Sequence, residues 1–278
     1  MSVDGFLTIH KPAGMTSHDV VAKVRRALKT KRVGHAGTLD PDATGVLVIA
    51  VGQATRLLPY LLTEPKVYRA VIGLGTATDT EDASGQVVAE ADASGLTQEA
   101  LRAVLPQFVG EIQQVPPMVS ALHHNGQRLY DLARQGITVE RAARTIIIHA
   151  LELVAPNTLR VTCGGGTYIR TLCKDIGEAL GLPAHMASLV REAVGPYRLQ
   201  DALFLDEITQ DALLPMHLAL GWPTVMVTDA EATELRLGRA VSASEEAETE
   251  MAALYRERLL ALVRLEEGRL QPFKVFAE

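Results

Sequence analysis

The sequence predicts a protein that contains both strands and helices and that ends in a small β-rich unit. Residues 46–51 and 66–75 have the length and the apolar content of strands, whereas residues 18–28 and 97–109 repeat apolar side chains at helical spacing. After about residue 200 this periodicity weakens, and residues 258–276 have the pattern of two strands joined by a turn at 266–268. We therefore expect alternating strands and helices, a linker over 220–229, and a second unit.

Composition limits the class of protein. The chain has 278 residues, of which 47% are apolar and 22% charged, enough for one large domain and a small one with a sizeable core. No apolar run approaches the roughly 18–20 residues that span a bilayer, and the first residues, MSVDGFLTIHKPAG, lack the regions of a signal peptide. We expect a cytoplasmic protein that does not act at a membrane.

Cysteines and histidines give no metal site. Cys163 and Cys173 fit neither a disulfide framework nor a CxxC motif, so we expect two buried thiols. His123 and His124 are adjacent, and no HExxH is present. The sequence therefore predicts no bound metal.

The net charge of −6 conceals an uneven distribution. Residues 201–278 carry 7 Lys and Arg against 15 Asp and Glu, whereas residues 1–62 carry 8 against 4. The basic first segment suits an RNA partner, whose phosphates need Lys and Arg. It equally suits an ordinary solvated helix face, and charge by itself leaves both open.

The N-terminal elements lead to a loop that contains Asp40. A short strand over 6–10 and the turn KPAGMTS precede a helix over 18–28, for which Ser17 is the expected N-cap. The stretch GHAGTLDPDATGVLVIAVG, residues 34–52, then places Asp40 in a loop rich in glycine just before a buried strand. Short polar groups surround it, namely His35, Thr38, Asp42 and Thr44. Such a carboxylate suggests a nucleophile or a general base more than a metal cage.

The middle of the chain contains a basic and aromatic segment. A short helix over 55–62, a strand with Tyr68, and an acidic turn over 76–85, expected to be solvated, come first. In residues 115–145 arginines recur around Tyr130, a pattern that suits RNA because guanidinium groups bind phosphate and rings stack on bases. The alternative is an ordinary helix over 129–134 beside a loop.

A strand over 159–163 meets the segment GGGTYIRTLCKDIGEALG. Its glycines lack the GxxxxGK[ST] pattern of a nucleotide-binding loop, so close backbone packing explains them better. Ile169, Leu172 and Ile176 form an apolar stripe on the helix that follows. Arg170 lies in its first turn, where the helix dipole disfavours a cation, so we expect a nearby carboxylate as its partner.

Five motifs together carry a family resemblance. KPAGMTS at 11–17, GHAGTLDPDATGVL at 34–47, KVYRA at 66–70, RLYDLARQG at 128–136 and GTYIRTL at 166–172 resemble, in order and spacing, the motifs of TruB-family tRNA pseudouridine synthases. The resemblance covers roughly residues 5–200. The acidic tail, with LRLGRAV and GRLQPFKVF, resembles a short PUA RNA-binding domain.

This resemblance implies an α+β fold, with a mixed, mostly antiparallel sheet and flanking helices, and a small β-rich PUA-like domain. We expect a catalytic domain over 1–222 with an RNA-gripping segment at about 118–144, and the second domain over 223–278. The implied activity is the isomerisation of uridine 55 in the T arm of tRNA to pseudouridine, with flipping of the base and no cofactor. The implied partner is tRNA, and we expect a monomer that needs no protein partner.

The resemblance also implies roles for single residues. Asp40 is the implied catalytic residue, whether it attacks the ribose, attacks the base or deprotonates the sugar, and Arg170 pairs with it, keeps it charged and orients it. Tyr68 stacks on the target base and is a candidate acceptor of the carbon 5 proton. The implied substrate-binding residues are Lys11, His35 beside the flipped nucleotide, Thr38, Arg128, Tyr130, Tyr168, and Leu189 on the apolar side of the pocket.

Two other interpretations remain. The segment 40–44 fits the DxDxT pattern of haloacid-dehalogenase-type phosphatases, although here the apolar strand follows the pattern instead of preceding it. The chain could also be a non-catalytic protein that remodels tRNA through the same surface, and an enzyme that opens the elbow of tRNA could add such a chaperone role.

Overall fold

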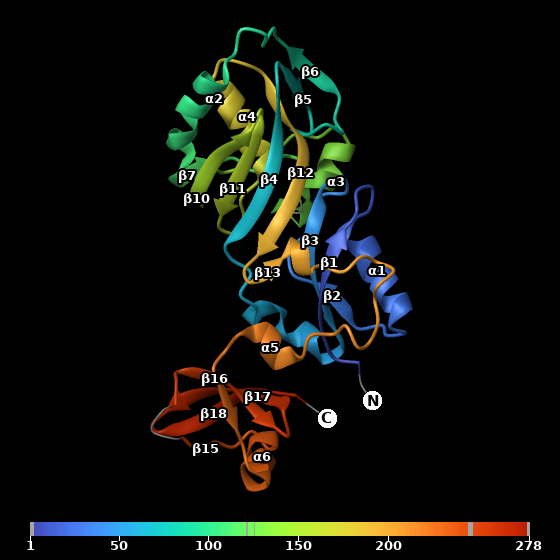
Figure 1. The fold of residues 1–278 in the computed structure, drawn as a ribbon, viewed down its shortest axis with the longest axis vertical. Helices are drawn as coiled ribbons and strands as arrows, with labels where there is room; N and C mark the ends of the chain where they lie inside the picture. The colour runs from blue at the N-terminus through green and yellow to red at the C-terminus, as the bar shows by residue number, and fades with distance from the viewer. Residues whose placement is uncertain (1–2, 121, 125, 244–246, 277–278) are drawn as a thin grey trace.

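A twisted, mostly antiparallel sheet forms the centre of the protein (Figure 1). The computed structural model describes residues 3–120, 122–124, 126–243 and 247–276. Within these residues the main sheet has nine strands. Its central path runs, in spatial order, through β1 (Gly5–Lys11), β3 (Thr44–Val51), β12 (Ala184–Val194), β4 (Lys66–Leu74), β11 (Thr158–Cys163), β10 (Arg144–Ala155) and β7 (Gly110–Gln114). Two short strands, β2 (Val33–His35) and β13 (Tyr197–Arg198), pair with β3 and β12.

Strand β3 is buried on both faces, which explains its continuous apolar sequence. One face packs with α1 (Ser17–Ala27), and the other packs with the 3-10 helix η1 (Gly52–Tyr60).

Two details of the elements expected on either side of β3 are wrong. Thr16 is the N-cap of α1, because its side chain and that of Asp19 form a reciprocal capping box, and the short helix after β3 is 3-10 instead of α.

The sheet has one joint, where β3 meets β12. All the other pairs in this sheet of the described chain are antiparallel, but β3 and β12 run parallel and pair only at Thr44 with Val190 and Gly45 with Arg191. Gly45 has a φ of 106°, and a Cβ there would collide with the backbone of Arg191. Glycine therefore allows the close approach that joins the two halves of the sheet.

Helices α2 (Gln98–Val104) and α4 (Ile169–Ala179), with the 3-10 turn η2 (Leu105–Phe108), pack on the part of the sheet formed by β4, β10 and β11. The predicted apolar stripe of α4 is buried, and both cysteines are buried thiols, as expected. The helix expected over 97–109 changes to 3-10 geometry at η2, which has a proline at its start.

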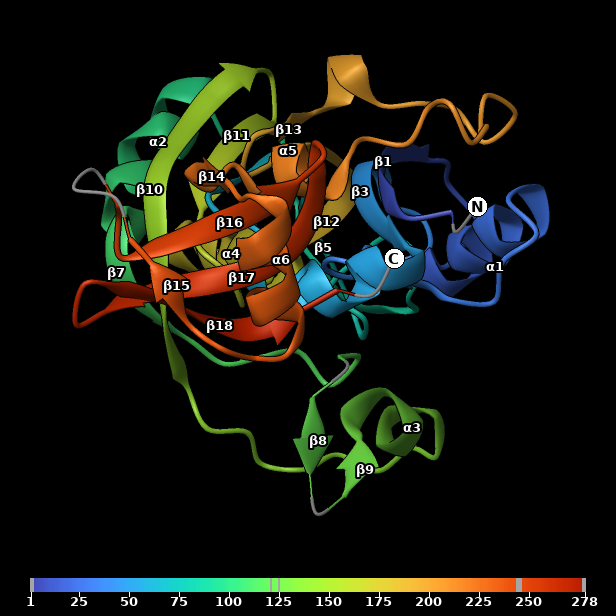
Figure 2. The ribbon, with the colours of Figure 1, turned by 90° about the horizontal axis from the view of Figure 1, so that it is seen from below.

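Two small units extend from this body. A hairpin of β5 (Thr76–Thr78) and β6 (Val87–Glu90) lies at one end (Figure 1). In Figure 2, β8 (His123–His124), β9 (Gln127–Arg128) and α3 (Leu129–Arg134) stand clear of the rest of the fold. We call residues 118–144 the arm; its residues 121 and 125 lie outside the described residues.

A second sheet forms the C-terminal part of the chain, as the sequence predicts. Its order is β14 (Thr224–Met226), β16 (Glu250–Tyr255), β17 (Arg258–Glu266), β18 (Arg269–Val275) and β15 (Val241–Ser242), with α6 (Asp229–Arg236) packed on it. The expected linker contains β14, which pairs with β16, and follows α5 (Met216–Leu220). The α+β fold with a β-rich end is confirmed.

This second sheet packs against the main body through η1. Tyr60 on η1 lies 6.0 Å from Trp222 and 5.9 Å from Phe273 between ring centroids, and the ammonium of Lys274 lies 4.8 Å from the centre of the Tyr60 ring.

Among the residues described, no helix combines the length and the hydrophobicity that a membrane crossing requires.

The joint between β3 and β12 predicts a sharp effect of one methyl group. We expect Gly45→Ala to lower the free energy of unfolding by about 2–3 kcal/mol, since the Cβ overlaps backbone that cannot move without separating the strands. Gly14→Ala is the matched control, because Gly14 also has positive φ but an added Cβ meets nothing within 4 Å. We expect Gly14→Ala to lower the free energy of unfolding by about 1 kcal/mol, because only the strain of positive φ acts there. Equal losses for both variants in urea unfolding would contradict this account of the joint.

Candidate functional site

A cavity of about 310 Å³ opens beside the joint of the main sheet. The loop before β3, strands β4 and β12, the start of the arm and the start of α4 all contribute to its wall. Six of the predicted site residues line it: Thr38, Asp40, Tyr68, Tyr168, Arg170 and Leu189. The structure therefore brings together residues from three of the five motifs, with Leu189 from β12 beside them.

Asp40 and Arg170 form an ion pair at this cavity. The Nε of Arg170 lies 3.0 Å from Oδ2 of Asp40, and Nη2 donates a hydrogen bond of 3.4 Å to Oδ1. The Arg170 side chain is 4% exposed, whereas that of Asp40 is 38% exposed. The expectation that Arg170 has a carboxylate partner is confirmed, and the geometry leaves the carboxylate accessible while its cation is buried.

Arg170 also holds two other segments. Its Nη1 donates to the carbonyl of Thr80 at 3.0 Å and its Nη2 to that of Val119 at 2.8 Å, while Asp82 Oδ2 lies 3.7 Å from its Nε. The expected solvated turn over 76–85 is exposed only in part, at Asp79, Ala83 and Ser84, because Thr80 and Asp82 face Arg170. A buried guanidinium requires acceptors on all sides, and this acidic turn supplies a carbonyl and a second carboxylate.

The residues on either side of Asp40 are fixed by buried side chains. Ser17 Oγ accepts a hydrogen bond from the Leu39 N–H at 2.9 Å. Lys11 Nζ donates to the carbonyl of Pro41 at 2.7 Å and to that of Met15 at 2.6 Å. Lys11 is fully buried, and burial lowers the pKa of its ammonium to about 8. This placement corrects the expectation that Lys11 contacts the substrate, since it holds the loop from inside.

Arg191 is a site residue that the sequence analysis missed. It is 1% exposed, and its guanidinium donates to the carbonyls of Val46 at 2.8 Å, Thr38 at 3.1 Å and Gly37 at 3.2 Å. It thus fixes the other end of the Asp40 loop. The sequence did contain a signal for Arg191. It follows Leu189 by two residues, so in a strand the two side chains lie on the same face.

Two further residues of the cavity, Ser120 and Lys66, were also missed, as was Gln114 behind its wall. Gln114 brackets the backbone of Tyr168 with hydrogen bonds of 2.9 and 3.1 Å and so fixes the start of α4. The buried Ser120 Oγ lines the cavity and has no hydrogen-bond partner among the described residues. Lys66 lines it from β4. Only Lys66 lay within a quoted motif, KVYRA.

Besides Lys11, three predicted substrate-binding residues do not line this cavity. The ring of His35 packs edge-on against that of His18 at 5.4 Å, and burial lowers the pKa of His35. Arg128 and Tyr130 belong to the arm, where the Tyr130 ring lies 5.8 Å from the guanidinium of Arg128 and 5.4 Å from that of Arg134. Contacts with substrate at these residues would therefore lie outside the cavity.

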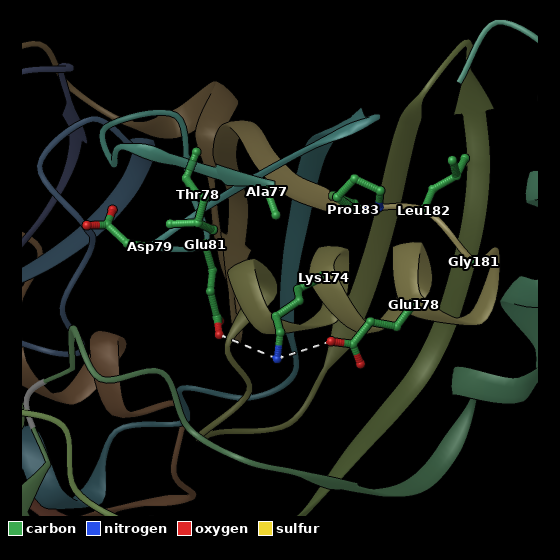
Figure 3. Close-up of a pocket in the computed structure, with 11 residues that line it drawn as sticks. Ala77, Thr78, Asp79, Glu81, Lys174, Glu178, Gly181, Leu182 and Pro183 are labelled. Carbon is green, nitrogen blue, oxygen red and sulfur yellow. Dashed lines mark ion pairs between the residues drawn. The ribbon is translucent and has the colours of Figure 1, made fainter. Parts of the chain in front are cut away.

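A second cavity, of about 460 Å³, lies between α4 and the β5–β6 hairpin (Figure 3). Figure 3 shows Lys174 between Glu81 and Glu178, at 3.9 and 3.4 Å. Glu81 also accepts a hydrogen bond of 2.6 Å from Thr171 Oγ1, next to Arg170. None of the predicted site residues lines this cavity, and its charged groups hold the acidic turn against α4.

Comparisons with known proteins agree with this geometry. Residues 25–169 match the family model of the TruB family pseudouridylate synthase N-terminal domain, and residues 170–217 match that of the tRNA pseudouridylate synthase B C-terminal domain. The chain is 43% identical over 293 residues to tRNA pseudouridine synthase B of Streptococcus pneumoniae serotype 2, covering 99% of this chain and all of the relative. It is 54% identical over 215 residues to that of Heliobacterium mobile, covering 75% and 70%.

Solved structures show the same fold. The protein in the crystal structure of a Cbf5-Nop10-Gar1 complex superposes with a TM-score of 0.70 at 28% identity, over 98% of this chain and 85% of that one. The family match excludes the phosphatase interpretation of residues 40–44 and the interpretation as a purely non-catalytic protein. The chain belongs to the TruB family of tRNA pseudouridine synthases and is an isomerase that forms pseudouridine in tRNA.

Proposed function

We propose that the enzyme isomerises uridine 55 in the T arm of tRNA, and that this base flips into the 310 Å³ cavity to meet Asp40. The observation that carries the proposal is the accessible Asp40 carboxylate held by the buried Arg170 in the cavity wall. A base inside a folded T loop is out of reach of a protein carboxylate, so it must leave its stack at a cost of a few kcal/mol.

Asp40 is the proposed catalytic residue. Attack on the ribose, attack on the base and removal of a sugar proton all need a carboxylate that is fixed in position and accessible from the cavity. The two contacts from Arg170, together with the fixed backbone at residues 39 and 41, supply this pre-organisation.

Tyr68 and Leu189 are the proposed base-binding residues. Tyr68 is 8% exposed, and its burial raises the pKa of its hydroxyl, so the ring is a neutral phenol near pH 7. A neutral phenol is a poor proton acceptor, and this favours stacking on the base over uptake of the carbon 5 proton. Leu189 lies in the same wall and covers the apolar side of the base.

The proposed grip on the tRNA lies outside the cavity. Lys23, Arg26 and Lys29 are exposed on or just after α1, and the arm presents Tyr130 between two arginines. We propose the domain division at 222/223, with a PUA-like domain that adds RNA contacts, a monomeric enzyme, and a chaperone role that uses the same grip.

The Asp40 assignment predicts a loss of chemistry without a loss of binding. We expect Asp40→Asn to reduce tritium release from carbon 5-labelled uridine 55 in a T-arm stem-loop at least about a thousand-fold, because the amide cannot replace the carboxylate. RNA affinity and any refolding of misfolded tRNA should persist. Asp42→Asn, an exposed position in the same loop, is the control and should keep near-normal activity. Turnover by Asp40→Asn would refute the proposed role.

We expect that lysine cannot replace Arg170. Arg170→Lys keeps the charge but cannot reach Asp40, Thr80 and Val119 together, so we expect the single-turnover rate to fall on the order of a hundred-fold or more. The dissociation constant for the RNA should change less than about three-fold. Arg160→Lys, whose arginine pairs with Glu192 on the surface, provides the comparison. A rate equal to that of Arg160→Lys would contradict this prediction.

The arm is expected to become ordered on binding. Hydrogen exchange of the backbone amides of α3 should slow about ten-fold or more when T-arm RNA is added, since α3 stands clear of the rest of the fold (Figure 2). The amides of β3 should exchange slowly in both states and serve as the internal reference. Unchanged exchange in α3 at saturating RNA would show that the arm does not engage this substrate.

A further inference from the structure

Lys66 is a cation of the cavity for which neither the fold nor the proposed chemistry gives a use. It is the first residue of β4 and lies two residues before Tyr68, so both side chains share one face of the strand and line the same cavity. Arg69 has the opposite orientation and forms a surface ion pair with Glu192 at 2.8 Å. Lys66 therefore faces the space assigned to the nucleotide.

The other cations lining this cavity are already engaged. Arg170 binds Asp40 and two carbonyls, and Arg191 binds three carbonyls. Within the described part of the chain, the ammonium of Lys66 has no hydrogen bond and no carboxylate within 4.0 Å. Burial lowers the pKa of Lys66, and the nearby charge of Glu64 acts against this shift.

A rigid glycine turn forms the wall beside Lys66. The Gly165 N–H donates to Glu64 Oε1 at 2.8 Å, and the Glu64 carboxylate oxygens lie more than 4.0 Å from the Lys66 ammonium. The N–H of Gly164 donates to the carbonyl of Ile147 at 2.9 Å, and Thr167 Oγ1 donates to the Gly164 carbonyl at 3.0 Å. The turn is thus held in place without using Lys66.

The same turn leaves room for a nucleic-acid backbone. Gly164 and Gly166 line the cavity, and at Gly166, with a φ of 78°, an added Cβ would meet no atom within 4 Å. No side chain at this position obstructs the approach of a bulky group toward Lys66. An ammonium in a partly desolvated wall attracts an anion more strongly than one in bulk water.

We propose that Lys66 and the turn Gly164–Gly166 form a subsite for a phosphate that flanks the flipped uridine. The proposal rests on the proposed function, in which the base stacks on Tyr68. Lys66 and Tyr68 are separated by one strand repeat of about 6.6 Å, so one strand face presents a ring for the base and an ammonium for its backbone. The subsite would draw the phosphate inward as the base leaves its stack.

The salt dependence of RNA binding tests the charge of the ligand. With T-arm RNA and proteins that carry Asp40→Asn, so that the RNA stays unmodified, we expect Lys66→Met to raise the dissociation constant about five- to ten-fold at 100 mM salt. The slope of log K against log salt concentration should fall by about 0.7–0.9, the value for one lost phosphate contact. Arg69→Met removes the same charge from the opposite face of β4 and should leave the slope unchanged.

Neutral linkages in the RNA test the position of the phosphate. Two T-arm RNAs carry a methylphosphonate on the 5′ or the 3′ side of the target uridine. In the protein with Lys66, one of these linkages should raise the dissociation constant about five- to ten-fold. In Lys66→Met the same linkage should cause no further rise, so both proteins should bind that modified RNA with the same dissociation constant. Lys66→Arg, which keeps the charge, should remain sensitive to the same linkage, and urea unfolding checks that all variants are folded.

Two results would overturn the subsite. If the methylphosphonate raised the dissociation constant by the same factor in the protein with Lys66 and in Lys66→Met, the phosphate would lie elsewhere. Reduced tritium release in Lys66→Met without Asp40→Asn, with an unchanged salt slope, would assign Lys66 to a carbonyl oxygen of the base. Failure of the proposed function itself has a different signature, because Asp40→Asn would then still release tritium whatever residue stands at 66.

Discussion

The structure depends most on the buried guanidinium of Arg170. A buried cation is costly unless acceptors surround it, and here they come from three segments far apart in the chain. Asp40 belongs to the loop before β3, Thr80 and Asp82 to the acidic turn, and Val119 to the start of the arm. One side chain therefore fixes the carboxylate that we propose is catalytic and links it to the segment that we propose contacts the RNA.

Rigidity around Asp40 comes from main-chain contacts. Lys11, Ser17 and Arg191 are all buried, and each hydrogen-bonds the backbone of the loop instead of the Asp40 carboxylate. The residues around the carboxylate are therefore held in place while the carboxylate stays accessible. Such an arrangement positions a group for chemistry and leaves its oxygens free to reach a substrate. Buried cations serve here as structural donors, and their charges add to the positive potential around one carboxylate.

The cavity and the RNA surface have different physical requirements. Under the proposed function the cavity must exclude water and fit one base, and it is built from sheet strands and the start of α4, which the core holds fixed. The proposed grip must follow the shape of a larger molecule, and β8, β9 and α3 of the arm stand clear of the body, which allows this (Figure 2). An overall net charge of −6 does not oppose RNA binding, because the acidic residues concentrate in the last 78 residues of the sequence and the basic ones near its start.

The sequence by itself determined the features that depend on neighbours along the chain. The apolar run of β3, the hairpin of β17 and β18 and the stripe of α4 follow from local periodicity, and the need of Arg170 for a carboxylate follows from its place in a helix. The order of the motifs gave the family. Tertiary structure decided that Lys11 is buried, that the acidic turn binds Arg170 and that Arg191 holds the Asp40 loop. These contacts join residues 30 to 154 positions apart, and no local pattern encodes which distant carbonyl a buried cation will meet.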